Sequence, residues 1–336
     1  MTENKLNCVV VGGFGYIGSE LSSALYSSGN ETTVIDRNIF LSDHGQYNKL
    51  VLKDIRDVTV DDFEGADWVF DYSGLSNDPT GDLDVSLTSE VNITGRHHCA
   101  TTAKKAGVAN YVFASTCSVY GSVPSGIDVD ENFGVTPLTA YAQSATRMEE
   151  KLAGIADENF RVLCIRHGTV YGLSQKMRFD LVVNLMCKTA FTEKSLYVTG
   201  GGDQRRPLVS ISTIVEFCEH LLDLKVLTSQ FGTVNLAEAN FQIKQLAQAV
   251  SKVWDDVSVT IVPDDADKRD YSISTSKLQE EFNFLPANRL ESSILELRTE
   301  FPSLNIYDPR YYTQPWYKLL LQIDKNRSAA GRGLSD

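Results

Sequence analysis

Three glycines near the N-terminus and an aspartate that follows them have the residue types and the spacing needed to bind a dinucleotide. The apolar residues 6–11 run directly into Gly12, Gly15 and Gly18, which form a G-x-x-G-x-x-G turn. Gly12 permits a tight turn, Gly15 allows the backbone to approach a pyrophosphate, and Gly18 allows close packing of the helix that starts there. Amides at the N-terminus of that helix would then point at the phosphates.

Asp36 ends a second apolar run, residues 34–36, and follows Gly18 by 18 positions. At that distance an acidic side chain binds the ribose hydroxyls of an adenosine and repels a 2′-phosphate. The pattern of strand, glycine turn, helix, strand and acid therefore predicts binding of NAD rather than NADP. The predicted cofactor contacts are Gly12, Gly15, Tyr16, Ile17, Gly18, Asp36, Arg37, Asp54, Ile55 and Gly74.

Alternating buried strands and amphipathic helices continue beyond Asp36 and would position these residues. The predicted strands are residues 49–53, 67–71, 111–114 and 161–165, and the predicted helices are residues 83–106 and 139–156. This alternation predicts an α/β fold with a doubly wound, Rossmann-like parallel sheet. Ligands bind beyond the carboxyl ends of the strands in such sheets, and that end of the strand 111–114 carries a run of hydroxyl residues, 115–118.

The regular alternation changes beyond about residue 171. Helices are predicted near residues 179–190, 211–224, 241–254 and 274–282, with a short strand near residues 208–210. We predict three parts. Residues 1–172 form the NAD-binding domain, and residues 173–302 form mainly a smaller α/β substrate lobe, with some elements returning to the first domain. Residues 303–336 form a C-terminal tail whose polar end, residues 325–333, is expected to be frayed.

Composition excludes several classes of function. The 336 residues are 42% hydrophobic, and the net charge of -13 disfavours nucleic acid and anionic membranes as partners. No apolar run reaches 18 residues, and the sequence predicts neither a signal peptide nor a membrane span. The six cysteines have no C-x-x-C spacing, and the adjacent His97 and His98 would point apart on a helix, so no metal site is predicted. A cytoplasmic location is expected.

The turn GGFGYIG, the run STCSVYG at residues 115–121, and Tyr141 with its following helix together resemble a known family. They look like the extended short-chain dehydrogenase/reductases, in particular NAD-dependent nucleotide-sugar epimerases and dehydratases such as UDP-galactose 4-epimerase. The resemblance covers about residues 6–300 and implies a nucleotide-diphosphate sugar as partner. It implies two catalytic residues, Tyr141 and Thr116, four substrate-binding residues, Ser118, Asn184, Arg206 and Arg269, and a structural or substrate-proximal Asn92.

A homodimer is also implied by the resemblance. In the family, the helices that correspond to residues 83–106 and 139–158 pair with those of a second subunit in a four-helix bundle. Such pairing requires an apolar stripe on each helix. Met148, Leu152 and Ile155 make the better stripe, on the second helix.

The sequence departs from the family pattern at one position that matters for the chemistry. Oxidation of a sugar hydroxyl requires a base for its proton, and a phenol serves at neutral pH only if its pKa falls well below ~10. In the family pattern, Tyr-x-x-x-Lys, the lysine holds the nicotinamide ribose and lowers that pKa, whereas this chain has Ala145 there. An unassisted phenol would be ~0.1% ionised at pH 7, a penalty of about 4 kcal/mol. The positive nicotinamide ring of NAD+ offsets part of it.

Family residues that this chain lacks also help to distinguish among the possible reactions. Dehydratases of the family that remove water across C5 and C6 show an Asp-Glu pair after the threonine, where this chain has Cys117 and Ser118. We therefore predict an NAD-dependent nucleotide-sugar epimerase that acts by transient oxidation at a sugar carbon, with C4 as first choice. Two alternatives stay open. One is a nucleotide-sugar 4-dehydrogenase or ketoreductase that retains NAD(H), and the other is a catalytically impaired, cofactor-loaded binding or regulatory protein.

Overall fold

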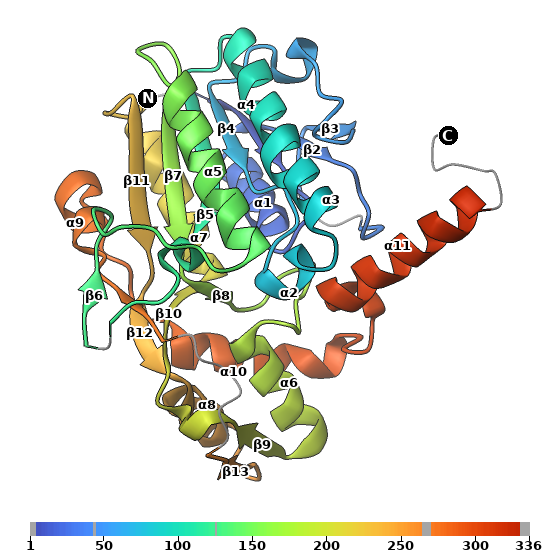
Figure 1. The fold of residues 1–336 in the computed structure, drawn as a ribbon, viewed down its shortest axis with the longest axis vertical. Helices are drawn as coiled ribbons and strands as arrows, with labels where there is room; N and C mark the ends of the chain where they lie inside the picture. The colour runs from blue at the N-terminus through green and yellow to red at the C-terminus, as the bar shows by residue number, and fades with distance from the viewer. Residues whose placement is uncertain (1–4, 43–44, 125, 264–269, 330–336) are drawn as a thin grey trace.

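Seven parallel strands form the central sheet of the computed structural model, which describes residues 5–42, 45–124, 126–263 and 270–329. The strands are β1 (Asn7–Val11), β2 (Glu31–Asp36), β3 (Lys49–Leu52), β4 (Trp68–Asp71), β5 (Asn110–Thr116), β7 (Arg161–His167) and β11 (Phe231–Leu236). Their order is β11-β7-β5-β4-β1-β2-β3 (Figure 1). The order reverses between β1 and β4, which confirms the predicted doubly wound sheet and places the ligand crevice beyond the ends of these two strands.

The sheet is covered on both faces, as the side chains of β1 show. Cys8 and Val10 pack toward α1 (Gly18–Ser27) and α7 (Ile211–Asp223). Val9 and Val11 pack toward the opposite face, which is covered by α4 (Arg96–Lys105) and α5 (Ala140–Ile155) (Figure 1). Because successive side chains of a strand point to opposite faces, a strand buried on both faces has the continuous apolar sequence seen here.

The helix predicted over residues 83–106 is present, but a π-helical segment interrupts it. α3 (Val85–Ser89) continues through the π-helical residues Glu90–Gly95 into α4. Asn92 lies in this segment and is buried, with its Oδ1 accepting from the amide of Leu75 (2.8 Å) and its Nδ2 donating to the carbonyl of Leu75 (2.9 Å). The π turn therefore holds the loop that follows β4.

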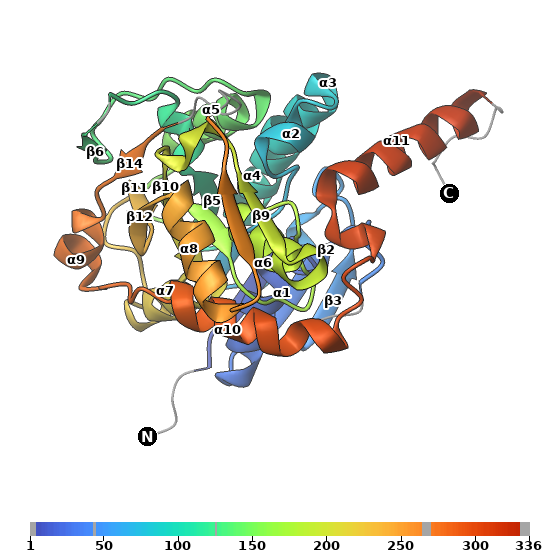
Figure 2. The same cartoon turned by 90° about the horizontal axis from the view of Figure 1, so that it is seen from below.

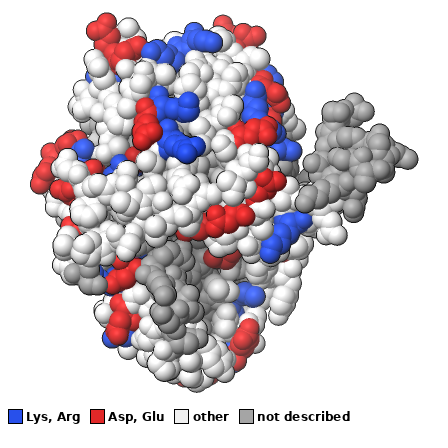
Figure 3. Space-filling model, in the orientation of Figure 1, with Lys and Arg blue, Asp and Glu red and all other residues white. Residues whose placement is uncertain are grey.

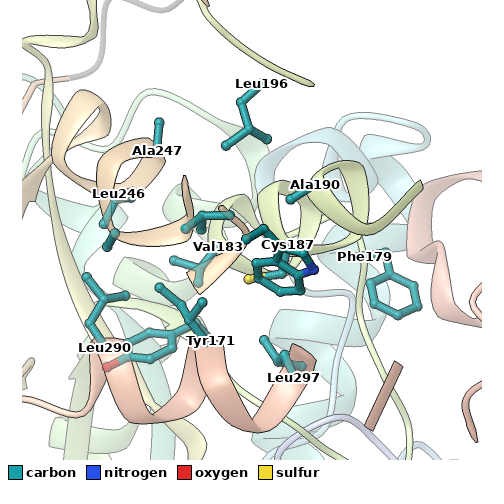
Figure 4. Packing of buried hydrophobic residues seen from close by; sticks show 14 of the residues in the cluster. Tyr171, Phe179, Val183, Cys187, Ala190, Leu196, Leu246, Ala247, Leu290 and Leu297 are labelled. Carbon is teal, nitrogen blue, oxygen red and sulfur yellow. The ribbon is translucent and has the colours of Figure 1, made fainter. Parts of the chain in front are cut away.

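The second part of the chain adds a lobe at the carboxyl ends of the strands (Figure 2). Its elements are β8 (Thr169–Tyr171), α6 (Val182–Glu193), β9 (Ser195–Val198), β10 (Arg205–Ser210), β12 (Ala239–Gln242), α8 (Ile243–Val253), β13 (Ser258–Ile261) and α10 (Leu290–Glu300). In Figure 4, Val183 of α6, Leu246 of α8 and Leu297 of α10 point toward one another in one buried cluster. β11 and α7 return to the main sheet, and the domain boundary at residue 172 stays a prediction.

Short elements complete the described chain. They are α2 (Asp78–Gly81), β6 (Asp128–Val129), β14 (Ser272–Ile273), α9 (Ser276–Phe282) and the 3-10 segments Val60–Phe63, Cys117–Tyr120, Gly200–Gly202, Phe301–Ser303 and Pro309–Tyr311. The pair β6 and β14 and the strands β8, β9, β11, β12 and β13 were not predicted from the sequence. Most of them are two to four residues long, which is too short for a periodic pattern to stand out.

The prediction of a frayed C-terminal end was wrong for residues 325–329, because they continue the helix α11 (Thr313–Ala329). Pro315 is the third residue of this helix, where a missing N–H costs nothing because the first amides of a helix have no partner within it. The helix extends outward from the body of the molecule (Figure 1). No described helix has the length and apolar composition that crossing a membrane requires.

Candidate active site

A cavity of about 620 Å³ lies at the carboxyl ends of β1, β4, β5 and β7. The sheet side contributes the turn after β1, the loop after β4, the end of β5 and the first turn of α5. The lobe contributes the start of α6 and single residues of β10 and α8, and the C-terminal segment contributes residues 312–315 and 317. Its volume is in the range of sites that bind cofactors and small molecules.

The glycine turn has the shape that a dinucleotide phosphate requires. Gly12 has a φ of 79°, and the amide of Gly15 donates to the carbonyl of Gly12 (3.0 Å). A Cβ at Gly18 would lie 2.1 Å from that same carbonyl oxygen, so any side chain there would force the turn apart. Gly15, Tyr16 and Ile17 line the cavity directly before α1 begins. The turn therefore brings a helix N-terminus to the cavity wall, which fits the diphosphate of NAD.

Asp36 lies beside this turn at the end of β2. Its Oδ2 accepts from the amide of Phe14 (3.0 Å) and its Oδ1 accepts from the amide of Asn38 (2.6 Å). Burial raises the pKa of Asp36, while these backbone hydrogen bonds and the charge of Lys176 act in the opposite direction. The carboxylate is thus held next to the phosphate turn, as a ribose-binding acid must be.

The structure does not bring all of the predicted cofactor residues to the cavity. Arg37 is exposed and pairs with Asp54 (Nη1 to Oδ2, 3.1 Å), and Asp54 also accepts from Arg56. Ile55 is buried in the core between β1 and α4. Gly74 does line the cavity, with a φ of 109° and no room for a Cβ beside Asn92 Oδ1 (2.7 Å).

Thr116 and Tyr141 meet inside the cavity. Thr116 is the last residue of β5, and Tyr141 is the second residue of α5, whose N-cap Thr139 accepts from the amide of Ala142 (3.2 Å). Thr116 and Tyr141 both line the cavity, and the side chain of Thr116 acts to lower the pKa of Tyr141. Thr116 also accepts from the amide of Ser118 (3.1 Å), which brings a third hydroxyl to the same wall. This arrangement can move a proton to and from a bound alcohol.

Position 145 cannot supply charge to Tyr141. Ala145 is buried in an apolar cluster with Cys117 and Val119, and it is not among the residues that line the cavity. Burial raises the pKa of Tyr141, and the charge of Asp78 adds to this rise. Arg96 has the largest opposing effect.

Arg96 was not singled out from the sequence. It is 5% exposed, and it donates from Nε to Asp71 Oδ2 (2.9 Å) and from Nη2 to the carbonyl of Asp71 (2.7 Å). Its guanidinium lies over the ring of Phe113, 3.9 Å from the centroid. Arg96 lines the cavity and Asp71 does not, so the pair presents its positive end to the ligand. The sequence shows no sign of this pair, because Asp71 and Arg96 are 25 positions apart, on a strand and on a helix, and no local motif links them.

A second basic group comes from the segment that leads into α6. Arg178 donates to Asp180 Oδ2 (2.7 Å) and to Ser76 Oγ (2.9 Å), and its charge also lowers the pKa of Tyr141. Lys176 is 3% exposed, and its Nζ lies 3.8 Å from the ring centroid of Phe40. Burial lowers the pKa of Lys176 to about 7. Both residues line the cavity, and their charges suit a ligand that carries phosphates.

His167 also lines the cavity without having been singled out from the sequence. Its Nδ1 lies 3.1 Å from the carbonyl of Ser115, and its Nε2 lies 3.3 Å from the hydroxyl of Tyr72. Burial lowers the pKa of His167 to about 4, so the ring is neutral at physiological pH.

The predicted substrate residues have different positions. Arg206 is 6% exposed, lines the cavity from the lobe side and lies over the ring of Tyr271, 5.5 Å from its centroid. Asn184 is fully buried and donates to the hydroxyl of Tyr16 (2.7 Å), so it supports the cofactor turn from behind. Arg269 lies outside the described residues.

These features define a class of protein, and comparison with known proteins identifies it. The model of the NAD dependent epimerase/dehydratase family matches residues 8–237. The chain belongs to this family, which confirms the resemblance predicted from the sequence and the predicted cofactor, NAD.

Individual relatives catalyse several reactions on nucleotide sugars. A UDP-N-acetyl-alpha-D-glucosaminuronate decarboxylase of Bacillus cytotoxicus is 27% identical over 269 residues, 74% of this chain and 83% of the relative. A UDP-glucose 4-epimerase of Lactobacillus helveticus is 24% identical over 293 residues, 77% of this chain and 85% of the relative.

Solved structures confirm the fold. An NAD-dependent NDP-hexosamine 5,6-dehydratase superposes with a TM-score of 0.79 at 21% identity, covering 90% of this chain and 100% of the other. A UDP-N-acetylglucosamine 4-epimerase from Methanobrevibacter ruminantium has the same TM-score and identity, and covers 90% of this chain and 99% of its own.

Proposed function

We propose that this protein oxidises and re-reduces a carbon of a nucleotide-bound sugar, with epimerisation at C4 as first choice. The observation that carries the proposal is that Thr116 and Tyr141 line the same cavity as residues 15–17 of the glycine turn. Membership of the family supports an NAD-dependent reaction. The names of the similar proteins support a nucleotide-diphosphate sugar as substrate.

Tyr141 is the proposed base. The hydride acceptor and donor for the sugar carbon would be supplied by NAD+ bound at the glycine turn. Tyr141 takes the proton of the sugar hydroxyl and later gives it back, and the hydroxyl of Thr116, whose side chain acts to lower the pKa of Tyr141, assists this transfer. Since burial raises the pKa of Tyr141, the free phenol is protonated at neutral pH, and a nearby positive charge is required for useful rates.

Arg96 and Arg178 are the proposed source of this charge in place of a lysine at position 145. Both line the cavity, and both lower the pKa of Tyr141. Asp71 accepts from Nε of Arg96 (2.9 Å) and does not line the cavity, so the guanidinium rather than the carboxylate faces the ligand. This arrangement favours an active enzyme over a binding protein that has lost turnover.

Arg206 is proposed to bind the substrate diphosphate, with Ser118 near the sugar. Arg206 projects into the cavity from the lobe, opposite the sheet that carries Thr116. Its contact with Tyr271 fixes the plane of the guanidinium, and a fixed fork of donors suits a diphosphate. Asn184 and Arg269 remain predicted substrate residues, although the hydrogen bond of Asn184 to Tyr16 supports the cofactor turn.

The test is a product assay on the purified protein. The protein is incubated separately with UDP-glucose, UDP-N-acetylglucosamine and UDP-glucuronic acid, with Tyr141→Phe as the control, and the products are separated by chromatography. Simultaneous absorbance measurements detect reduced nicotinamide. Epimers formed by the unmodified protein and absent from the control would support the proposal.

Other outcomes of this assay separate the alternatives. A keto sugar with reduced cofactor that stays on the protein would favour the 4-dehydrogenase or ketoreductase. Release of carbon dioxide from UDP-glucuronic acid would favour decarboxylation, as in the Bacillus cytotoxicus relative. Binding of NAD and nucleotide sugars without any product would favour the cofactor-loaded binding protein.

A homodimer and a cytoplasmic location stay predictions. Met148 and Leu152, the stripe expected to pair with a second subunit, are fully buried against the sheet of the same chain. The outer surface of α5 instead presents polar residues such as Gln143 and Arg147. Acidic and basic side chains are interspersed over this side of the molecule (Figure 3). A four-helix bundle would therefore have to be built on polar contacts, and the resemblance to the family alone supports it.

A further inference from the structure

The chain returns to the cavity after α10. Tyr311 and Tyr312 pack on Phe179, with ring centroids 5.8 and 5.9 Å apart, and the amide of Phe179 donates to the carbonyl of Tyr311 (2.9 Å). From there residues 308–317, which we call the C-terminal strap, pass over the edge of the cavity into the first turns of α11.

Side-chain hydrogen bonds tie the C-terminal strap to two loops of the sheet domain. Arg310 donates from Nη1 to the carbonyl of Leu41 (2.9 Å), and Trp316 donates from Nε1 to the carbonyl of Ile39 (2.9 Å). Gln314 donates from Nε2 to the carbonyl of Pro79 (3.1 Å) in α2. Leu41 and Ile39 belong to the loop that follows Asp36, and Pro79 belongs to the short helix α2 that comes after β4. The strap thus bridges the two sides of the crevice.

Tyr317 lies at the end of the cavity that the cofactor turn forms. Its ring packs edge-on against Phe40, with centroids 6.0 Å apart at 86°, and both residues line the cavity together with Gly15 and Lys176. Burial raises the pKa of Tyr317, and the charges of Arg37, Asp36 and Asp54 all act on its hydroxyl. Because Phe40 belongs to the loop that follows Asp36, Tyr317 lies on the side of the cavity that carries the residue assigned to the adenosine ribose.

The chain is longer than the part of it that two similar solved structures cover. The solved structures of the 5,6-dehydratase and the 4-epimerase are covered over 100% and 99% of their length, but they cover only 90% of this chain. About a tenth of this chain therefore has no counterpart in either of those structures.

We propose that the C-terminal strap is part of the NAD site, where Tyr317 contacts the adenosine half of the cofactor and the strap slows its release. An aromatic ring at this place buries the flat face of an adenine, which is the contact that aromatic residues make best. The three hydrogen bonds of Arg310, Gln314 and Trp316 must break before the strap can lift from the crevice. The proposal rests on the placement of the cofactor given above and is independent of which sugar reaction the protein catalyses.

The test compares NAD binding in the full-length protein and three variants. Tyr317→Ala removes the ring, Tyr317→Phe keeps the ring without its hydroxyl, and Leu319→Ala is the control, because Leu319 lies on the same helix and is 45% exposed outside the cavity. The affinity for NAD is measured by calorimetry and its dissociation rate by stopped-flow fluorescence. Nicotinamide mononucleotide, which lacks the adenosine half, is measured in parallel.

We expect Tyr317→Ala to weaken NAD binding about tenfold and to speed its release by a similar factor, the loss of one aromatic contact. Nicotinamide mononucleotide should bind all four proteins equally, and Tyr317→Phe and Leu319→Ala should bind NAD like the unmodified protein. The proposal is overturned if Tyr317→Ala binds and releases NAD normally, if it binds NAD more tightly, or if it loses nicotinamide mononucleotide to the same extent. Failure of every sugar assay would leave these measurements unaffected, so the two proposals fail separately.

Discussion

The two ends of the cavity are built in different ways. At the cofactor end, residues 12–18 and Asp36 form a turn whose shape is set by backbone hydrogen bonds and by glycines that leave no room for a Cβ. At the catalytic end, Tyr141 depends on charges that reach it from α4 and from the segment before α6. Backbone shape is set locally, whereas charge balance is set by residues far apart in the chain. Loss of a catalytic side chain should therefore leave the affinity for NAD nearly unchanged. Loss of a residue at the cofactor end should lower both the affinity for NAD and turnover.

The largest effect expected on the catalytic end alone is that of Tyr141→Phe. Removing the hydroxyl removes the proposed base, and we expect turnover to fall about 10³-fold, within the range of general base catalysis. The affinity for NAD, measured by calorimetry, should change less than about twofold, because Tyr141 lies outside the glycine turn. If turnover survives, the base lies elsewhere and the two ends are not divided as described.

Arg96→Met tests whether a distant cation serves Tyr141. Removing the guanidinium raises the pKa of Tyr141 further, so a smaller fraction of the phenol is ionised at pH 7. We expect turnover at pH 7 to fall about tenfold and the pH profile to move toward alkaline values, with the rates converging at high pH. The measurement is turnover between pH 6 and 10.

Controls for Arg96 separate charge from folding. Arg96→Lys should keep most of the rate, and Arg147→Met, which removes an exposed arginine from α5, should leave the pH profile unchanged. Because Arg96→Met leaves Asp71 buried without its partner, the double variant Asp71→Asn, Arg96→Met should be measured as well. A profile that does not move in either variant would show that Arg96 does not act on Tyr141.

The contrast between the two ends also explains what the sequence could predict. The glycine turn and Asp36 follow from a local pattern with a fixed structural meaning, whereas the roles of Thr116 and Tyr141 were implied by the resemblance to the family. Every strand of the main sheet except the edge strand β11 was predicted, because apolar strands alternate with amphipathic helices in the sequence.

The missed features are those that only the packed chain creates. Arg96 and Lys176 look like surface residues in the sequence, and each is buried because a partner from another segment, Asp71 or Phe40, lies against it. Met148 and Leu152 are buried against the sheet of their own chain, and an apolar stripe in a sequence does not say whether it faces that sheet or a second subunit. The C-terminal strap has no local signal for a cofactor contact at all.

Asp36→Ala tests the cofactor end alone. Loss of the carboxylate removes the repulsion of a 2′-phosphate, and we expect the preference for NAD over NADP to narrow about tenfold. Because Asp36 also accepts from the amides of Phe14 and Asn38, Asp36→Asn is the matched variant that keeps a hydrogen-bond acceptor. The affinities for both cofactors are measured by calorimetry. Equal affinities in the unmodified protein would contradict the assignment of Asp36.

The smallest effect is expected from Lys176→Met. The native Lys176 places a charge from a distant part of the chain at the cofactor turn, so the variant tests whether charge matters at the cofactor end as well. Lys176 has a pKa of about 7, so it is a cation below pH 7 and loses that charge above it. The diphosphate of NAD favours the cation, and its affinity for the unmodified protein should therefore fall several-fold between pH 6 and pH 8.

The variant should bind NAD several-fold more weakly at pH 6, with little difference at pH 9 and a flatter dependence on pH. Among the groups that act on Lys176, the guanidinium of Arg178 and the carboxylates of Asp180 and Asp308 should stay charged over this range, because their pKa values are shifted away from it. His167 has a pKa of about 4 and does not titrate there either. Lys188→Met is the control, because Lys188 also lies over an aromatic ring, that of Tyr312, but does not line the cavity. If Lys176→Met keeps the pH dependence of the unmodified protein, another group titrates. The charge of Lys176 would then have no part in binding NAD.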